Sequence, residues 1–366
     1  MNFVSSNFNT ESRNFRGCSI ERNGLLSAGA TVIMETANQS NRGNIMTQLI
    51  AATKTSHAKA ILIGEHAVVY TQPAIAIPIP TIRLRAELTP RVDGQQLVTS
   101  AFFNGALFAA AGTRFAGIAT LIRQLLIRFD GQDCGFNLNI ISDLPPERGM
   151  GSSAATAVAI TRAFYAAFNT PLDHATLLRW ADVSERIIHG NPSGIDAATA
   201  SADKPQWIVR GKAPRALTRP TRGVLVIADS GIQGQTGQAV AHVATAIRQN
   251  PVLYDQITAL GQMTRHFALA IADNDIEQMG TLMTSAQHAL AALGVSNDTL
   301  DHLVAVATHA GALGAKLTGS GMGGCMLALA RDKAAAAKIA AALTAAGATA
   351  SWEYDFTAPV ENKKEQ

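Results

Sequence analysis

The sequence predicts a mixed α+β protein built from two domains. Segments that alternate apolar and polar residues, as half-buried strands do, are interspersed with longer segments of good helix formers. The chain has 366 residues, where a single domain usually has ~100 to 200, and its 47% apolar content allows full cores. Residues 205–222, which are rich in Pro, Arg and Lys, are the best candidate for a boundary. We therefore expect an N-terminal domain at residues 46–222 and a smaller C-terminal domain at 223–360.

Strands and helices alternate in the predicted N-terminal domain. Residues 136–141 alternate apolar and polar side chains and predict a half-buried strand, whereas residues 154–168 are good helix formers throughout. The remaining patterns predict, in chain order, strands at 56–63 and 74–88 and helices at 117–129 and 175–189.

The predicted C-terminal domain opens with a short apolar strand at residues 224–228. Several helices are expected between residues 237 and 312, followed by a loop and strand at 316–329. An alanine-rich helix at 332–346 and an alternating strand at 348–356 complete the domain.

The first 45 residues differ from the rest of the chain in composition. They are rich in Asn and Ser and lack a sustained periodicity, which is typical of a disordered segment. We expect either a start codon assigned too far upstream or a genuine flexible tail.

Composition and charge exclude several classes of protein. The net charge is +3, and the absence of a basic block or a basic and aromatic stripe argues against nucleic acid as a partner. Cys18, Cys134 and Cys325 are odd in number and far apart, which argues against disulfides or a zinc site and for a reducing compartment. No run approaches the ~18 apolar residues of a membrane span, and the N-terminus lacks the order of a secretory signal. We expect a cytoplasmic protein that does not bind membranes.

Residues 144–155 form a glycine-rich turn that leads into the helix predicted at 154–168. Gly149 and Gly151 can adopt positive φ and let a ligand approach the backbone. Ser152 and Ser153 lie where free N–H groups and the helix dipole face an anion, so the turn suits a triphosphate. The alternative is a serine N-cap on an ordinary helix.

Two familiar nucleotide motifs do not account for this turn. A G-x-x-x-x-G-K-[ST] loop is absent from the sequence, because Gly211-Lys212 is followed by Ala213. Residues 319–324 match a dinucleotide fingerprint, but a buried strand follows them instead of a helix, and no acidic residue lies about 20 positions later. The sequence therefore argues against a Walker-type NTPase and against NAD.

Two further segments carry polar residues at glycine corners. In residues 59–70 an apolar strand follows Lys59 and ends at Gly64, Glu65 and His66. In residues 185–196 a helix ends in a turn through Gly, Pro and Gly, which Glu185 and Asp196 bracket.

Together with residues 316–325, these segments resemble the three motifs of the GHMP small-molecule kinases, in the order of that family. The resemblance runs from about residue 56 to 356, and its most discriminating pieces are residues 64–70 and 189–196. Within the superfamily the chain is most similar to the mevalonate kinases. The resemblance implies a ribosomal S5 domain 2-like N-terminal domain, a ferredoxin-like C-terminal domain, and an active site between them that uses ATP and Mg²⁺.

The resemblance also implies roles for individual residues. Phosphoryl transfer requires that the phosphate charge is neutralised and the attacking hydroxyl positioned. Asp196 would accept or orient the hydroxyl proton beside Lys59, and Ser153 and Glu185 would bind Mg²⁺. The residues expected at the phosphates of ATP are Glu147, Arg148, Gly149, Met150, Gly151, Ser152 and Ser153. The residues expected at the substrate are His66, Ser193 and Gly321.

Each of these residues also has a purely structural interpretation. Glu185 alone would be read as a solvated acid beside Arg186 or Arg179, and Asp196 as an N-cap or turn residue. His66 and Ser193 are equally explained by local hydrogen bonds, and residues 319–324 by a tight turn before a strand. Arg148 and Met150 replace smaller residues of many relatives, which puts adenine preference in doubt but not phosphate binding.

The function implied is ATP-dependent phosphorylation of mevalonate to 5-phosphomevalonate, a step of isoprenoid precursor synthesis. Another GHMP kinase, specific for phosphomevalonate, homoserine or a sugar, is the nearest alternative. A ligand-binding regulator that has lost catalysis is the alternative of a different class, although it would have no physical need for Lys59, Ser153, Glu185 and Asp196 together. Whether the chain forms a homodimer is left open.

Overall fold

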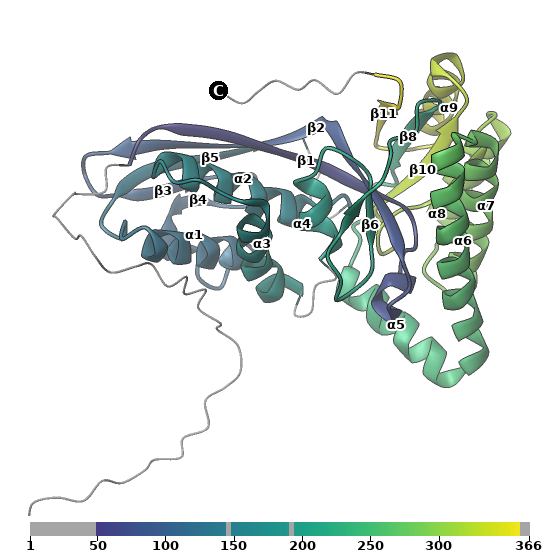
Figure 1. Cartoon of the computed structure of the whole chain (residues 1–366), viewed down its shortest axis with the longest axis horizontal. Coiled ribbons are helices and arrows are strands. Elements are labelled where there is room, and N and C mark those ends of the chain that lie inside the picture. Colours follow the sequence, from purple (N-terminus) through teal and green to yellow (C-terminus); the bar gives the residue numbers. More distant parts are fainter. Residues whose placement is uncertain (1–48, 144–147, 190–193, 359–366) are drawn as a thin grey trace, which may run out of the picture. The chain divides into compact units, whose positions relative to one another are not determined.

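The computed structural model of the chain describes residues 49–143, 148–189 and 194–358, without the side chains of Ile188 and His189. Two β-sheets, each with its own helices, make up this part of the molecule (Figure 1). The mixed α+β class predicted from the sequence is therefore confirmed. The predicted extension at residues 1–45 lies outside the described residues.

The first sheet is built around one long strand, β2. Its strands are β1 (Ala52–Ile63), β2 (Ala74–Arg91), β3 (Gln96–Thr99), β4 (Asn104–Ala106), β5 (Gly135–Ser142), β6 (Gln206–Ile208) and β7 (Arg215–Ala216). The order is β4-β3-β5-β2-β6-β7, and β1 pairs with β2 along its other side. Neighbours are antiparallel except β3 and β5. β1 is therefore an edge strand of this sheet.

Helices cover one face of the first sheet (Figure 1). They are α1 (Ala116–Arg128), α2 (Ser152–Ala167), α3 (His174–His189) and the short α4 (Ile195–Ala200). The alanines of α2 are buried against β1 and β2, because small side chains let helix and sheet approach closely. Ser56 Oγ of β1 donates to the backbone oxygen of Ala155 at 2.6 Å. The start of α2 is thus fixed directly against β1.

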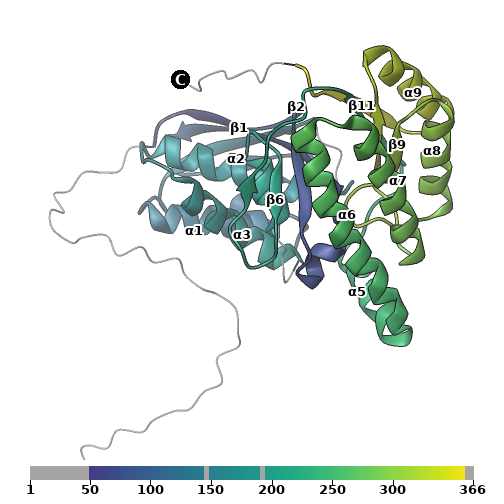
Figure 2. The same cartoon turned by 45° about the vertical axis from the view of Figure 1, so that its right-hand side comes forward.

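The second sheet has four antiparallel strands in the order β11-β8-β10-β9. They are β8 (Val224–Asp229), β9 (Gly314–Leu317), β10 (Cys325–Ala330) and β11 (Ala350–Asp355). Its helices are α5 (Thr236–Gln249), α6 (Tyr254–Asp273), α7 (Ile276–Ala292), α8 (Asp298–His309) and α9 (Lys333–Ala345). The helices α7, α8 and α9 contact the strands, and α6 packs on α7 (Figure 2). The β-α-β-β-α-β order is that of a ferredoxin-like domain.

The sequence-based elements agree with these bounds. The predicted strands at 56–63, 74–88, 136–141 and 224–228 correspond to β1, β2, β5 and β8, and the long predicted helices to α1, α2, α3 and α9. Three short 3₁₀ turns, at Ala67–Tyr70, Leu107–Ala110 and Pro251–Leu253, were not expected. The two sheets lie on either side of residue 222, and the exact domain boundaries stay a prediction.

On its free edge, β1 forms hydrogen bonds with the glycine-rich segment before α2 and with the residue after β9. Thr318 Oγ1, just after β9, accepts from the Ile61 amide at 3.0 Å and donates to the Ile61 carbonyl at 3.1 Å. The Lys59 amide donates to the carbonyl of Met150 at 3.1 Å. Because an edge strand otherwise leaves its N–H and C=O groups unpaired, these contacts satisfy the strand and bring three segments together.

The helices in the described ranges are all too short or too polar to span a membrane.

Candidate active site

The glycine loop, defined here as residues 148–151, ends in the left-handed backbone that its glycines allow. Gly149 has φ +74° and Gly151 φ +75°, as the sequence predicts. Gly151 is the N-cap of α2 and no side chain caps the helix, so the alternative of a serine N-cap is wrong. The first amides of α2 therefore have no partner within the helix, which makes this end suitable for an anion.

A second glycine loop, residues 319–324, lies directly against the first. A Cβ on Gly319 would lie 3.1 Å from the Gly149 carbonyl oxygen, and one on Gly324 would lie 2.8 Å from that of Arg148. A Cβ on Gly151 would lie 3.0 Å from Cγ of Lys59. The two loops approach so closely because these positions carry no side chains.

Lys59 is the residue that joins the glycine loop to a carboxylate. Its Nζ donates to the Gly149 carbonyl at 2.8 Å and lies 3.1 Å from Oδ1 of Asp196. The Lys59 side chain is 3% exposed and that of Asp196 is 34% exposed, so the carboxylate remains open to a ligand. Asp196 lies in the first turn of α4, where Gly194 at φ +76° forms the N-cap. Three elements distant in sequence thus place a lysine, a carboxylate and a phosphate-type loop together.

Ser153 and Glu185 form a second polar pair beside the loop. Ser153 Oγ donates to Oε1 of Glu185 at 2.6 Å, and Glu185 is buried. Burial, and next the negative charge of Asp196, raise the pKa of Glu185 to about 7. A solvated helix-face acid does not fit this position. Arg186 pairs instead with Asp182.

His66 and Glu65 occupy the corner after β1. The backbone turns there through Gly64 at φ +101° and His66 at φ +57°. His66 Nε2 donates to the carbonyl of Ser320 in the second glycine loop at 2.8 Å, and burial lowers the pKa of this ring. Glu65 forms a fully buried ion pair with Lys316 of β9. Burial raises the pKa of Glu65 and lowers that of Lys316. This corner therefore connects the first sheet to the second.

Comparison with known proteins decides the family. The family models for the GHMP kinases N terminal domain and the GHMP kinases C terminal domain match residues 115–203 and 267–349. The mevalonate kinase of Aeropyrum pernix is 32% identical over 301 residues, which cover 77% of this chain and 89% of that protein. The chain belongs to the mevalonate kinase family.

Two further comparisons agree with this membership. The mevalonate kinase of Pyrococcus furiosus is 32% identical over 314 residues, covering 80% of this chain and 92% of the relative. The crystal structure of L. major mevalonate kinase in complex with R-mevalonate superimposes with a TM-score of 0.72 at 26% identity. That match covers 84% of this chain and 97% of the other. Membership of a kinase family implies ATP as a substrate.

In this member of the mevalonate kinase family, most of the predicted site residues lie close together. Lys59, Asp196, Ser153 and Glu185 lie around the glycine loop, as described above. Met150 is buried, and its backbone carbonyl accepts a hydrogen bond from the Lys59 amide. Gly321 packs so tightly on the Val295 carbonyl that a Cβ would lie 2.1 Å from it. Glu147 and Ser193 lie outside the described residues.

Sequence reasoning misses two buried ion pairs near the site. Lys316 is a lysine in an otherwise apolar strand, which in principle signals a buried acidic partner, but that partner, Glu65, lies in another motif. Arg148 Nε lies 3.0 Å from Oδ2 of Asp229 at the end of β8. No local pattern relates these residues, because the two partners of each pair are far apart in the sequence.

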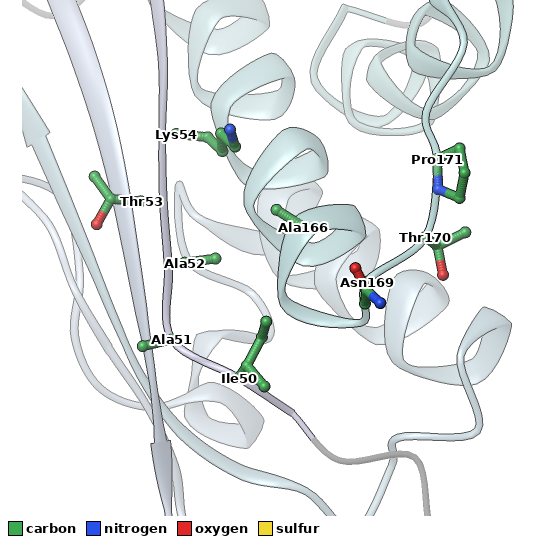
Figure 3. A pocket seen from close by; sticks show the side chains of 9 residues that line it. All are labelled: Ile50, Ala51, Ala52, Thr53, Lys54, Ala166, Asn169, Thr170 and Pro171. Carbon is green, nitrogen blue, oxygen red and sulfur yellow. The ribbon is translucent and has the colours of Figure 1, made fainter. Parts of the chain in front are cut away.

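A surface pocket of about 510 Å³ lies away from these residues (Figure 3). It is lined by Ile50, Ala51, Ala52, Thr53, Lys54, Ala166, Asn169, Thr170 and Pro171. Its wall includes the end of α2, whereas the glycine loop precedes the start of that 16-residue helix, about 24 Å away. None of the predicted site residues lines this pocket, so it is not part of the candidate active site.

Within the described residues, no cluster of three or more His, Cys, Asp or Glu side chains suits a metal ion. The hydroxyl of Ser153 and the carboxylate of Glu185 are nevertheless hard oxygen donors of the kind that Mg²⁺ prefers. Mg²⁺ usually takes one or two carboxylates from the protein and completes its shell with phosphate oxygens and water. The pair therefore fits a magnesium ion that arrives with a nucleotide.

Proposed function

We propose that the chain transfers the terminal phosphoryl group of ATP to the 5-hydroxyl of mevalonate, a step of isoprenoid precursor synthesis in the cytoplasm. The observation that carries this proposal is the position of Lys59, whose ammonium lies within 3.1 Å of both the Gly149 carbonyl and Asp196. One side chain thus links the phosphate-type loop to a carboxylate that is one-third exposed. The mevalonate kinases among its relatives favour mevalonate as the acceptor.

Asp196 acts on the attacking hydroxyl in this proposal. The mevalonate oxygen forms a bond to the terminal phosphorus of ATP, the bond from that phosphorus to the ADP oxygen breaks, and the hydroxyl proton passes to Asp196. Lys59 stabilises the negative charge that develops at the oxygen and at the phosphoryl group. Its contact with the Gly149 carbonyl holds the ammonium beside the loop that receives the phosphates.

The start of α2 holds the phosphates of ATP. Its unpaired amides and the positive end of the helix dipole favour the negative charge of phosphate. The glycine conformations at Gly149 and Gly151 let the backbone approach the nucleotide without side chains in the way. Arg148, Met150 and Ser152 belong to the same loop and helix start, and Glu147 precedes them.

Ser153 and Glu185 are the residues that would hold Mg²⁺. Burial raises the pKa of Glu185 because it disfavours the ionised carboxylate, and a divalent cation beside it would stabilise that ionised form. When bound, Mg²⁺ neutralises phosphate charge. The hydrogen bond between Ser153 and Glu185 places their oxygens side by side.

His66, Ser193 and Gly321 form the proposed substrate side. His66 is already hydrogen-bonded to the carbonyl of Ser320, so we assign it the task of holding the second glycine loop against the end of β1 where mevalonate binds. Gly321 has φ +72° in that loop.

The test is release of ADP with purified protein, ATP and Mg²⁺ across mevalonate, phosphomevalonate, homoserine and galactose. We expect turnover with mevalonate at a kcat/KM at least ~100-fold above that of the other three acceptors, a discrimination that sites built on buried hydrogen bonds exceed. Preferred turnover of another acceptor would reassign the substrate within the GHMP kinases. Saturable ATP binding without turnover of any acceptor would favour a regulator.

A further inference from the structure

The Arg148 side chain extends from the glycine loop to Asp229 in the second sheet. Its Nε lies 3.0 Å from Oδ2 of Asp229, and the two side chains are 16% and 4% exposed. A charged pair buried to this degree is costly to form, so its position at a phosphate-type loop calls for a reason beyond stability.

Asp229 is a rigid anchor for this contact. It is the last residue of β8, where the backbone pairs with Cys325 of β10 on one side and Ala350 of β11 on the other. Its second oxygen, Oδ1, accepts a hydrogen bond from the Gly231 amide at 2.9 Å. The carboxylate is therefore fixed by the sheet and by the turn after β8, and only Oδ2 is directed to Arg148.

The loop itself receives support from both sheets. Lys59 of the first sheet holds the carbonyls of Gly149 and Met150 through its side chain and its amide. On the other side, the Arg148 carbonyl packs against Gly324 and its guanidinium reaches Asp229. Through Asp229, the second sheet thus forms an ion pair with this loop.

We infer that Asp229 is a positioning residue for the nucleotide, acting through Arg148 to hold the glycine loop in the shape that receives the terminal phosphates of ATP. This inference rests on the proposed use of ATP. Arg148 Nε and Nη1 are buried and make no hydrogen bond, so the ionic attraction and not a directed hydrogen bond holds the pair. The R148K variant keeps that attraction in part, because lysine carries the same charge but as an ammonium on a flexible chain and not as a planar guanidinium.

The test measures ATP affinity by calorimetry in the presence of Mg²⁺ for R148M, D229N, the double variant and R148K. We expect each single neutral variant to weaken ATP binding by about 10- to 100-fold, the scale of a displaced binding group, with mevalonate affinity unchanged. The double variant should bind ATP as weakly as either single variant, because both remove the same contact. R148K should recover part of the loss.

Thermal unfolding of the same proteins separates positioning from a merely structural role. A single variant leaves the other charge buried without its partner and lowers Tm, whereas the double variant removes both charges and regains it. Positioning predicts that ATP affinity stays low in the double variant although Tm recovers. If ATP affinity recovers together with Tm, or never falls, the inference is overturned.

A matched control uses the exposed pair of Arg331 and Glu277, whose side chains are 56% and 55% exposed. R331A also breaks an arginine and carboxylate pair, and it should leave ATP affinity unchanged. Failure of the wild-type protein to bind ATP would contradict the proposed function itself. Normal wild-type binding with undiminished affinity in R148M and D229N would contradict only the role of Asp229.

Discussion

Lys59 and Asp196 are the two residues to which we assign the chemistry at the glycine loop. The lysine is almost fully buried, while the carboxylate is one-third exposed. A carboxylate held in this way can take a proton only from a hydroxyl that is placed within hydrogen-bond reach of it.

Replacing Asp196 by asparagine tests its assigned role. D196N keeps the size of the side chain but removes the base, so we expect kcat to fall by ~100-fold or more while ATP affinity changes little. Steady-state kinetics and calorimetric ATP titration of the same preparation measure the two quantities. A D196N protein with wild-type kcat would remove Asp196 from the mechanism.

Glu185 makes the free energy of unfolding of the metal-free protein depend on pH. Its pKa is about 7 in the folded protein against an ordinary value of 4.5, chiefly because it is buried. Between these pH values the folded state holds a proton that the unfolded chain has released. The free energy of unfolding therefore falls as the pH rises through this window.

The E185Q variant isolates this titration because its amide does not ionise. With a chelator present, we expect wild type to lose roughly 3 kcal/mol of stability relative to E185Q between pH 4.5 and pH 7, at about 1.4 kcal/mol per pKa unit. Urea denaturation at a series of pH values measures the difference. Two curves that run parallel over this range would contradict the raised pKa.

At the scale of single elements, the glycine loop needs both its backbone conformation and its lack of side chains. Gly151 combines φ +75° with a position where a Cβ would press on Lys59 at 3.0 Å. Gly112 has nearly the same φ, +76°, but nothing lies within 4 Å of a Cβ built there. The two positions separate the effect of strain from the effect of crowding.

We expect G151A and G112A to lose similar stability, about 1–2 kcal/mol, since both force alanine into left-handed backbone. Only G151A should displace the lysine, with a fall in kcat of about 10- to 100-fold. Urea denaturation and steady-state kinetics of the two variants measure these effects. Equal kcat values of the two variants would mean that crowding of Lys59 at position 151 does not affect catalysis.

Elements with a clear period could be predicted from the sequence, whereas several of the short ones could not. The alternation in residues 136–141 and the alanine-rich run of 154–168 each contain enough turns or repeats to fix a period. In contrast, β3, β6, β7 and α4 have six residues or fewer, and their conformation depends on the strands and helices that contact them. Of the proposed site, Lys59, Ser153, Glu185 and Asp196 could be named from the sequence because the motifs that contain them resemble those of the GHMP kinases and occur in the same order.

The pairing of distant residues could not be predicted in the same way. Glu65 and Lys316 are 251 residues apart, and neither motif specifies the other as its partner. Their contact follows from the way β1 meets β9, which only the folded chain defines. The same reason hides the contact between Arg148 and Asp229.

At the scale of the whole molecule, the Glu65–Lys316 pair ties the two sheets together without exposure to water. Removal of one buried partner leaves the other charge without compensation, so we expect E65Q to reduce the free energy of unfolding by about 3–5 kcal/mol. The apolar double variant E65L/K316M should recover most of this loss, because it buries no charge. Urea denaturation of the three proteins tests the prediction. An E65Q variant as stable as wild type would contradict an ionised buried pair.

The most direct test of the whole account is the identity of the product formed from ATP and mevalonate. Phosphorus NMR and mass spectrometry of a completed reaction with Mg²⁺ should find ADP and 5-phosphomevalonate in equal amounts. ADP without a phosphorylated acceptor, or no ADP from a protein that binds both substrates, would contradict the claim that this site transfers a phosphoryl group to mevalonate.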